Sequence, residues 1–278
     1  MKTIIDPSEM QAAALEWRAR GLRVGFVPTM GFLHRGHTSL MDRARALCDV
    51  LVVSIFVNPL QFGPNEDLDR YPRDPEGDAA KCAAHGTDLL FMPTALYPPG
   101  HTTRVAVGTL GEGLCGADRP THFEGVTTVV ARLFGIVQPH VSVFGEKDYQ
   151  QLAIIRRMTR DLAIPVEVVG GALVRDHDGV ALSSRNKYLT QAERLRARTL
   201  SGGLRTVQAA VEGGERIVQT LLALGRSSID ADHLQYLEIR SADDLTPLVT
   251  LDRPARVFAA ARYGSTRLID NMALPDPT

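Results

Sequence analysis

Short apolar runs alternate with amphipathic stretches along the first part of the chain. Residues 23–27 and 50–57 are rich in Val, Ile and Phe, which is typical of strands buried on both faces of a parallel sheet. Residues 38–48 lie between them and place their apolar side chains on one helical face, with Asp and Arg on the other. This order of strand, helix and strand predicts a right-handed βαβ unit.

The alternation continues beyond this unit and predicts the fold of the first part of the chain. The further elements expected here are helices over 75–85, 127–137 and 148–162 and strands over 89–92, 141–144 and 166–169. Such alternation is typical of an α/β domain with a Rossmann-like, doubly wound parallel sheet. Residues 28–37, 58–61 and 145–147 each follow an expected strand, so we expect them to converge where ligands of such sheets bind.

The pattern changes after about residue 174. The elements expected in the second part are helices over 191–212 and 215–224 and strands over 234–240, 255–261 and 267–269. We therefore predict a Rossmann-like domain over 1–174 that binds nucleotide, and a smaller mixed α+β domain over 175–278, with a hinge at 175–187. Residues 58–76 form a long connection rich in Pro, Asp and Gly and are a candidate lid.

The composition narrows the functional class only a little. The 278 residues include 31 Lys and Arg against 32 Asp and Glu, so a net charge of −1 favours neither nucleic acid nor a membrane surface as partner. The N-terminal residues lack the apolar core of a signal peptide, and the longest apolar run is too short to cross a bilayer. Three widely spaced cysteines predict neither a disulfide framework nor a zinc site. We expect a cytoplasmic globular protein.

Residues 27–37 read Val-Pro-Thr-Met-Gly-Phe-Leu-His-Arg-Gly-His and join the first strand to the following helix. A helix N-terminus offers unpaired N–H groups and a partial positive charge, which together attract anions. His34 and His37 add two imidazole donors there, so the segment favours phosphate binding. Two other interpretations stay open: the histidines could cap the helix at the surface, or they could bind a metal from one helical face.

A second polar segment, Gly145-Glu-Lys-Asp-Tyr-Gln-Gln151, follows the expected strand over 141–144. An anionic ligand would account for Lys147 just past a buried strand, and one of Gln150 and Gln151 is expected to face the same crevice. Alternatively, Asp148 is the N-cap of the next helix and Lys147 is solvated.

A third segment, Leu182-Ser-Ser-Arg-Asn186, places two hydroxyls beside a guanidinium, a combination that suits polyphosphate oxygens. Taken alone, it is better explained as a polar turn between domains. Gly111-Glu-Gly-Leu-Cys-Gly116 fits the dinucleotide pattern G-x-G-x-x-G, but the residues after it do not suggest a helix start. We interpret it as a flexible loop rather than a nicotinamide site.

Five segments, in this order along the chain, resemble those of the pantothenate synthetase family, whose members are pantoate–β-alanine ligases of the HIGH-motif nucleotidyltransferase superfamily. They are Pro28-Thr-Met-Gly-Phe-Leu-His-Arg-Gly-His37, Ser54-Ile-Phe-Val-Asn-Pro-Leu-Gln-Phe62, Arg119-Pro-Thr-His-Phe-Glu-Gly125, Gly145-Glu-Lys-Asp-Tyr-Gln-Gln151 and Leu182-Ser-Ser-Arg-Asn186. A looser similarity extends to Thr266-Arg-Leu-Ile-Asp-Asn271. The resemblance implies that ATP and Mg²⁺ are used, that the carboxylate of (R)-pantoate forms pantoyl adenylate and pyrophosphate, and that β-alanine then releases AMP. It also implies a homodimer.

The resemblance further implies roles for individual residues. His34 and His37 are the HIGH pair, and Lys147 and Arg185 complete the expected catalytic set. The residues expected to bind ATP are Pro28, Met30, His34, His37, Gly145, Lys147, Asp148, Leu182, Ser183, Ser184 and Arg185. The residues expected to bind pantoate or β-alanine are Met30, Asn58, Gln61 and Gln151. Tyr71 belongs to the candidate lid, and the sequence identifies no ligands for Mg²⁺.

Two rival functions would use parts of the same set. A related nucleotidyltransferase would move AMP onto a phosphate-bearing substrate and stop there, whereas a nucleotide-binding sensor would not react. The two glutamines and the Ser-Ser-Arg segment argue against the first rival, and the intact set of His34, His37, Lys147 and Arg185 argues against the second. A tRNA-charging role is disfavoured, because the sequence offers no basic anticodon-binding module.

Overall fold

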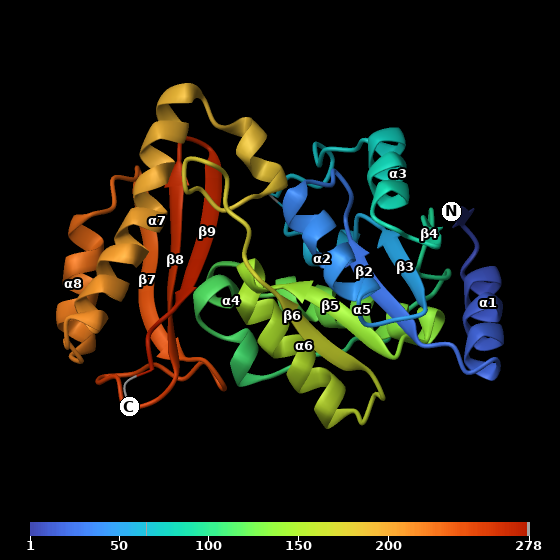
Figure 1. The fold of residues 1–278 in the computed structure, drawn as a ribbon. Helices are drawn as coiled ribbons and strands as arrows, with labels where there is room; N and C mark the ends of the chain where they lie inside the picture. The colour runs from blue at the N-terminus through green and yellow to red at the C-terminus, as the bar shows by residue number, and fades with distance from the viewer. Residues whose placement is uncertain (65, 277–278) are drawn as a thin grey trace. The chain divides into compact units, whose positions relative to one another are not determined.

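The computed structural model describes residues 1–64 and 66–276, and it contains two compact units (Figure 1). The first unit comprises Met1–Glu146 and Gln151–Ala172, and the second comprises Lys147–Gln150 and Leu173–Thr278. The chain therefore changes units around Lys147 before it leaves the first unit for good after Ala172.

A six-stranded parallel sheet forms the centre of the first unit. Its strands are β1 (Lys2–Ile4), β2 (Val24–Thr29), β3 (Val50–Ile55), β4 (Leu89–Phe91), β5 (Val141–Gly145) and β6 (Glu167–Gly171), in the spatial order β1-β4-β3-β2-β5-β6. From β2 the chain first moves outward through β3 and β4 and then crosses back to β5 on the other side. This reversal makes the gap between β2 and β5 the topological switch point, as the predicted doubly wound sheet requires.

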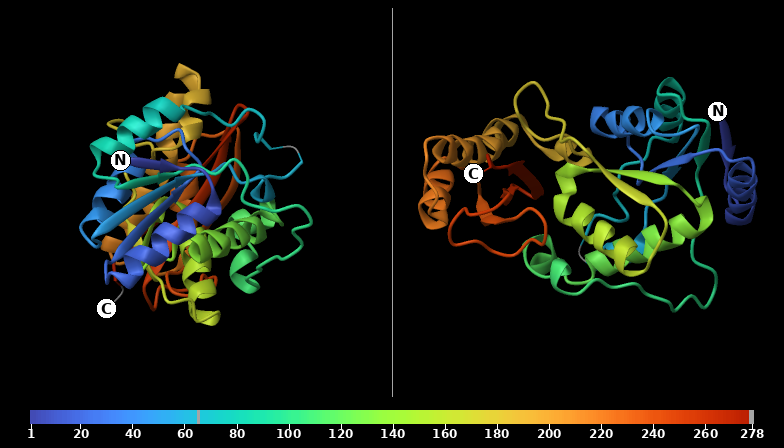
Figure 2. Two further views of the ribbon diagram at one scale, coloured as in Figure 1. Left: turned by 90° about the vertical axis from the view of Figure 1, so that its right-hand side faces the viewer. Right: turned by 60° about the horizontal axis from the view of Figure 1, so that its bottom comes forward.

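Helices cover both faces of this sheet. They are α1 (Pro7–Ala19), α2 (Arg35–Arg45), α3 (Pro75–Ala84), α5 (His122–Val137) and α6 (Tyr149–Asp161). The left view of Figure 2 shows α2 and α3 on one side of the strands and α1 and α5 on the other. The apolar stripe of α2, including Met41 and Ala44, packs with Val27, Val53 and Leu90 of the strands in a fully buried core. The apolar face of the helix and the apolar residues of the strands are thus buried in the same core.

The segment that fits G-x-G-x-x-G is more ordered than the sequence suggested. Its first glycine ends a 3-10 turn, η2 (Thr109–Gly111), and a short helix, α4 (Leu114–Asp118), begins directly after Gly113. A Cβ at Gly116 would lie 1.7 Å from the carbonyl oxygen of Gly111, so this glycine lets the chain pack on itself. The interpretation as a flexible loop is therefore wrong, since a close backbone contact accounts for the pattern.

The second unit has a three-stranded antiparallel sheet with two helices. The elements are α7 (Gln191–Glu212), α8 (Val218–Ser227), β7 (His233–Ser241), β8 (Ala255–Tyr263) and β9 (Thr266–Ala273), with β8 in the middle of the sheet. Alternate residues of β8, Val257, Ala259 and Ala261, pack in the core with Leu204 and Leu221 of the helices. Figure 1 shows α7 and α8 beside this sheet. The predicted fold class, a doubly wound parallel sheet plus a smaller α+β part, is confirmed.

The sequence analysis did not predict the first two elements of the chain, β1 and α1. The strand β1 and the helix α1 precede the first element that the sequence pattern predicted. The helix α1 buries only Met10 and Ala14 fully, so its apolar stripe is short and weakly defined. Its start is nevertheless marked by local chemistry, because Asp6 caps it and Pro7 occupies its first position.

Candidate functional site

The two histidines of the HIGH segment cap the start of α2. His34 is the N-cap, with extended backbone, and its Nδ1 accepts a hydrogen bond from the backbone N–H of Gly36 at 3.1 Å. The Nδ1 of His37 accepts from the backbone N–H of His34 at 3.3 Å, which completes a capping box. The two rings are stacked with their centroids 4.0 Å apart and tilted by 31°. Capping is therefore one function of the pair.

This capping also fixes the hydrogen-bonding character of both rings. A neutral imidazole whose Nδ1 accepts a hydrogen bond carries its proton on Nε2. Each ring therefore presents an Nε2–H donor beyond the cap, at the N-terminus of an 11-residue helix that begins with Arg35, Gly36 and His37. Two such donors beside the helix dipole suit an anion that gains negative charge.

The loop before the histidines is held by a residue that the sequence analysis missed. Phe32 has a φ of 52°, a left-handed conformation that is uncommon for a bulky residue. The carboxylate of Asp78 on α3 accepts from the backbone N–H groups of Phe32 and Leu33, at 2.7 Å each, and is almost completely buried. These charge-assisted hydrogen bonds stabilise the turn that aims the histidines.

The expected pantoate-binding residues of η1 (Pro59–Gln61) lie close together after β3. The amide of Asn58 donates to Oε1 of Gln61 at 3.1 Å, and the amide nitrogen of Gln61 lies 3.0 Å from the sulfur of Met30. Asn58 and Gln61 are both buried, and the Tyr97 hydroxyl donates to Asn58 at 2.8 Å. The structure thus brings Met30, Asn58 and Gln61 into one group of uncharged side chains.

The approach of α5 makes this arrangement possible. A Cβ at Gly125 would lie 2.2 Å from the carbonyl oxygen of Leu60, so only a glycine lets α5 approach η1 this closely. The Gly125 carbonyl in turn accepts a hydrogen bond from the amide of Asn58 at 3.0 Å. A glycine inside a helix normally costs stability, and here it supplies the space for Gln61.

A basic cluster surrounds the main chain of Gln61. Arg119 donates to the main-chain carbonyl of Gln61 at 3.2 Å, and Nδ1 of His122 lies 2.9 Å from the same oxygen. Arg119 also forms a bidentate pair with Glu66, at 2.6 and 2.5 Å. Although burial raises the pKa of Glu66, the Arg119 guanidinium outweighs it and holds that pKa below its usual value. In the sequence, Arg119 and His122 stood out only as part of the third of the five segments that resemble the family.

The remaining expected residues of the first unit lie at strand ends. Pro28 is near the end of β2, and Gly145 ends β5 on the other side of the switch point. Gln151 lies in the first turn of α6, which follows β5 after the 3-10 turn η3 (Glu146–Asp148). Tyr71 is buried and its ring packs against that of Phe62. Asn65 of the candidate lid lies outside the described residues.

Lys147 and Asp148 belong to the second unit, although they directly follow β5. The ammonium of Lys147 lies 3.7 Å from the Asp148 carboxylate, and 20% of the Lys147 side chain is exposed. This is a loose contact with a half-exposed partner, so it does not tie up the charge of Lys147. The Lys147 ammonium is thus partly exposed and is not neutralised by a close ion pair.

The Leu182–Arg185 segment also lies in the second unit, at the end of a tight hairpin. Arg175 and Ala181 pair as an antiparallel bridge, and the N–H of Leu182 donates to the carbonyl of Val174 at 3.0 Å. Ser183 then caps η4 (Ser184–Tyr188), and its hydroxyl accepts from the N–H of Arg185 at 3.3 Å. Ser184 is buried, whereas Ser183 and Arg185 are partly exposed.

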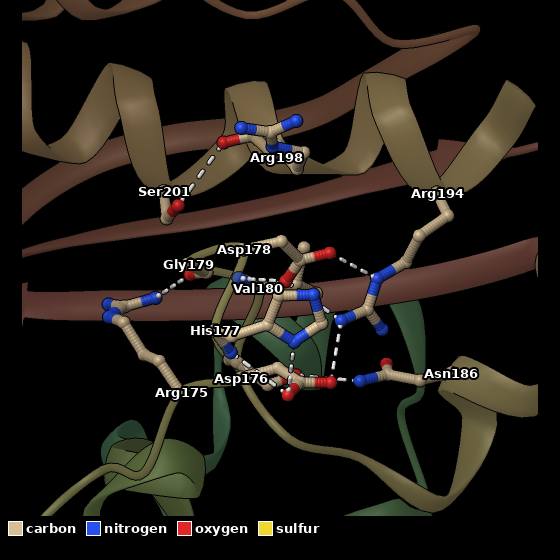
Figure 3. Close-up of polar contacts among 11 residues, drawn as sticks. Arg175, Asp176, His177, Asp178, Gly179, Val180, Asn186, Arg194, Arg198 and Ser201 are labelled. Carbon is tan, nitrogen blue, oxygen red and sulfur yellow. Dashed lines mark hydrogen bonds and ion pairs between the residues drawn. The ribbon is translucent and has the colours of Figure 1, made fainter. Parts of the chain in front are cut away.

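An ion-pair cluster stabilises the tip of this hairpin. Figure 3 shows the side chain of Arg194 pointing at Asp176 and Asp178, with nitrogen–oxygen distances of 2.6–2.9 Å. Hydrogen bonds from His177, and then the charge of Arg194, hold the pKa of Asp176 below its usual value. The pKa of Asp178 is also lowered, chiefly by its hydrogen bonds from Arg194. The hairpin that leads to Ser183 is therefore firmly anchored on α7.

The part of the chain that the structure describes contains no helix long and apolar enough to cross a membrane. The described residues also contain no group of three or more His, Cys, Asp or Glu side chains arranged to hold a metal ion. The metal-binding interpretation of His34 and His37 therefore has no third ligand of these kinds among them.

Comparisons with known proteins give a consistent result. The family model described as pantoate-beta-alanine ligase matches residues 2–273. The pantothenate synthetase of Trichlorobacter lovleyi is 52% identical over 281 residues, covering 99% of each chain. The crystal structure of pantothenate synthetase from Thermus thermophilus superposes with a TM-score of 0.93 at 47% identity, over 99% of this chain and 100% of the other. A Francisella tularensis pantoate-beta-alanine ligase, described as complexed with beta-gamma ATP and beta-alanine, gives 0.81 at 33% identity, over 98% and 97%.

Proposed function

The chain belongs to the pantoate–β-alanine ligase family, and we propose that its residues join (R)-pantoate to β-alanine with ATP in two steps. In the first step, a pantoate carboxylate oxygen bonds to the α-phosphorus of ATP. The bond from the α-phosphorus to the oxygen that bridges the α- and β-phosphates breaks, so that pantoyl adenylate and pyrophosphate form. In the second step, the amine of β-alanine attacks the activated carbonyl carbon and loses a proton, AMP leaves, and pantothenate remains.

The observation that carries this proposal is the capping box of His34 and His37 at the start of α2, which places the proton of each neutral ring on Nε2. As pyrophosphate leaves, negative charge builds up on its oxygens, and donors fixed in advance stabilise that charge without reorganisation. His34 and His37 are held in the required tautomer by their own capping box. We assign them to the ATP phosphates, and we assign Lys147, Ser183, Ser184 and Arg185 to the same task.

Pantoate is assigned to the group formed by Met30, Asn58 and Gln61, together with Gln151. Its carboxylate must approach the phosphates of ATP, so further negative charge at its binding site would oppose the reaction. Neutral amides bind a carboxylate and hydroxyl groups without adding charge. The buried amide of Gln61 meets this need, Asn58 holds it in place through its own hydrogen bonds, and Met30 supplies an apolar contact.

The other ligands follow from the same assignment. Gly145 and Asp148 would contact the ribose, with Pro28 and Leu182 along the nucleotide, while Asn58 and Arg185 would assist the β-alanine step. The Francisella tularensis relative, described as a complex with beta-gamma ATP and beta-alanine, supports these two ligand classes. In the proposed division of labour, residues 1–174 supply the pantoate site and residues 175–278 the Ser-Ser-Arg phosphate loop.

Mg²⁺ is proposed to enter bound to ATP rather than in a site of its own. The described residues offer no cluster of three or more acidic or imidazole ligands. Mg²⁺ commonly keeps several waters and binds substrate phosphates, so it can neutralise ATP without such a cluster. The homodimer and the cytoplasmic location stay predictions, and light scattering of the purified protein tests the first of them.

The deciding experiment measures pyrophosphate release from enzyme, MgATP and (R)-pantoate without β-alanine. We expect a burst of about one equivalent, with AMP appearing only after β-alanine is added. A burst without AMP release after β-alanine would favour a nucleotidyltransferase that stops at AMP transfer. No pyrophosphate release in the presence of all three substrates would contradict the proposal and favour a nucleotide-binding sensor.

A further inference from the structure

Two adjacent residues of β9 hold the two segments of the second unit that carry the proposed phosphate-binding groups. Successive side chains of a strand point to opposite faces of the sheet. Asn271 pairs in register with Phe258 of β8, and Asp270 pairs with Ala259, which packs in the core beneath α7 and α8. Asn271 and Asp270 therefore point to different faces, and each reaches a different segment.

Asn271 holds the main chain of Lys147. Its side-chain amide donates to the Lys147 carbonyl at 2.9 Å, across 124 residues of sequence. Its Oδ1 accepts from Nε of Arg256 at 2.9 Å, so both ends of the amide are engaged. Asn271 and Arg256 are buried, with 3% and 9% of their surface exposed. In such a place a lost hydrogen bond would leave buried polar groups unsatisfied.

Arg256 and Tyr149 reinforce this contact from the same face of the sheet. The Arg256 guanidinium lies 4.1 Å from the centre of the Tyr149 ring, which also packs against Phe258. The Tyr149 hydroxyl donates to the carbonyl of Ala242 at 3.0 Å. The segment that carries Lys147 is therefore fixed to the second sheet on both sides of Asp148.

Asp270 holds the hairpin that leads to Ser183. It forms a bidentate pair with Arg175, at 2.6 and 3.0 Å, and only 4% of its surface is exposed. Arg175 also donates to the Gly179 carbonyl at 3.2 Å, across the hairpin, as Figure 3 shows. The backbone N–H of Asn271 donates to the Asp270 carboxylate at 2.7 Å, which ties the Asp270 side chain to the main chain of Asn271.

We propose that Asn271 and Asp270 are positioning residues for adenylate formation, which set the spacing between Lys147 and the Ser183–Arg185 segment. This inference rests on the proposed function, because it assumes that Lys147 binds the ATP phosphates. The two segments lie far apart in sequence, yet one dipeptide of β9 bonds to both. A shift of about 1 Å in a group that contacts the reacting phosphates can cost about 10²-fold in rate.

The proposal predicts a specific kinetic pattern for Asn271→Ala. Losing the contact with the Lys147 carbonyl should lower kcat/KM for ATP about 10- to 100-fold in the pyrophosphate-release assay. The KM for pantoate should change less than about 3-fold, because the pantoate residues belong to the first unit. Asn271→Asp keeps an acceptor for Arg256 but cannot donate to Lys147, so it should show the same defect.

A double-mutant cycle with Lys147→Ala separates positioning from a general structural effect. If Asn271 acts through Lys147, then Asn271→Ala should cost less than about 3-fold when Lys147 is already Ala. Leu221→Ala is the control, since it removes a fully buried side chain of α8 in the same unit. It should lower the Tm while leaving the KM for ATP unchanged.

Three outcomes would contradict either the role of Lys147 or the positioning role of Asn271. Full activity of Lys147→Ala would contradict the proposed role of Lys147 itself, and hence this inference. A strong defect of Lys147→Ala with an equally strong additional loss from Asn271→Ala would overturn the positioning role and leave the proposed function standing. Normal ATP kinetics in Asn271→Asp would overturn it as well.

Discussion

The histidine pair and the Lys147 segment are both assigned to ATP, but different interactions hold them in place. His34 and His37 are fixed by hydrogen bonds that span only three residues. The carbonyl of Lys147 is fixed by Asn271, which reaches it only after β9 has paired with β8. The capping hydrogen bonds of the histidines follow from a short sequence pattern, although Asp78 of α3 also holds the turn before them. The position of the Lys147 carbonyl depends on the paired strands of the second unit. The two should therefore respond differently to mutation.

The largest loss of stability is expected when the buried Asp270 carboxylate of β9 loses its partner. Arg175→Ala would leave Asp270 buried without its bidentate partner, and breaking such a pair typically costs about 3–5 kcal/mol. Burial already raises the pKa of Asp270, and Arg175 opposes that effect. A protonated carboxyl tolerates burial better, so the loss of stability should shrink as the pH is lowered from 7 to 5. Urea unfolding at both pH values measures this.

A matched control comes from an exposed pair in the first unit. Arg23 and Glu167 form a contact of 2.7 Å, but about half of each side chain is exposed. Arg23 also donates to the Leu47 carbonyl, so Glu167→Ala is the cleaner variant. It should cost less than about 1 kcal/mol. Equal losses in Arg175→Ala and Glu167→Ala would show that the buried pair is not an important anchor.

Lys147→Ala tests the segment that Asn271 of β9 holds, and it should affect the reaction rate rather than the stability. Removing one charged contact to a leaving group typically costs about 10²–10³ in rate. Pyrophosphate release should fall by this factor, while the Tm stays within about 1 °C, because the side chain makes only a loose contact with Asp148. Near-normal turnover would rule out the role assigned to Lys147.

His34 allows capping and catalysis to be separated at one position. His34→Asn keeps a good N-cap but removes the Nε2–H donor, so stability should be preserved and pyrophosphate release should fall about 10²-fold. His34→Ala removes both functions and should additionally cost about 0.5–2 kcal/mol in unfolding free energy. If the two variants lost the same stability, the cap would have to be formed by another group.

The same contrast explains how much of the molecule the sequence predicted. The strands from β2 to β6 and the helices α3, α6 and α7 follow apolar patterns that tertiary packing preserves, so their predicted bounds are close to the observed ones. Helices α2 and α8 were predicted in the right order but lie about three residues from their expected bounds. Helix α5 begins at His122, five residues before the predicted start, because its first turn contains His, Glu and Gly rather than an apolar stripe. The starts of α2 and α5 were therefore missed, because their first turns carry few apolar residues.

The residues that position the expected site were mostly missed, because their partners are distant in sequence. Asp78 bonds to backbone 45 residues away, and Arg119 reaches Glu66 across 53 residues. No local spacing marks such contacts, since they arise from the order in which strands and helices pack. The division of Gly145 and Lys147 between two units also lacks a local signal, because both belong to one short polar segment.

The smallest effect we expect is a difference in how acid affects the two units. His140 of the first unit accepts a hydrogen bond from the N–H of Val24 at 3.0 Å through its Nδ1. Burial, and then the charges of Arg18 and Arg23, lower its pKa in the folded state. The unfolded chain therefore binds this proton more readily, so the stability that neutral His140 contributes is present above about pH 6.5 and is lost as the pH falls.

In the second unit, Asp176 and Asp178 have lowered pKa values, so their contribution is lost only below about pH 4, where the unfolded carboxyls begin to bind protons. Hydrogen exchange at pH 7 and pH 5, corrected for intrinsic rates, should thus show β2 and β5 losing protection before β8 and β9 do. The slope for one proton is at most about 1.4 kcal/mol per pH unit. His140→Asn should abolish the difference at β2 and leave the second unit unchanged. Equal loss of protection in both units would instead mean that they unfold as one cooperative structure.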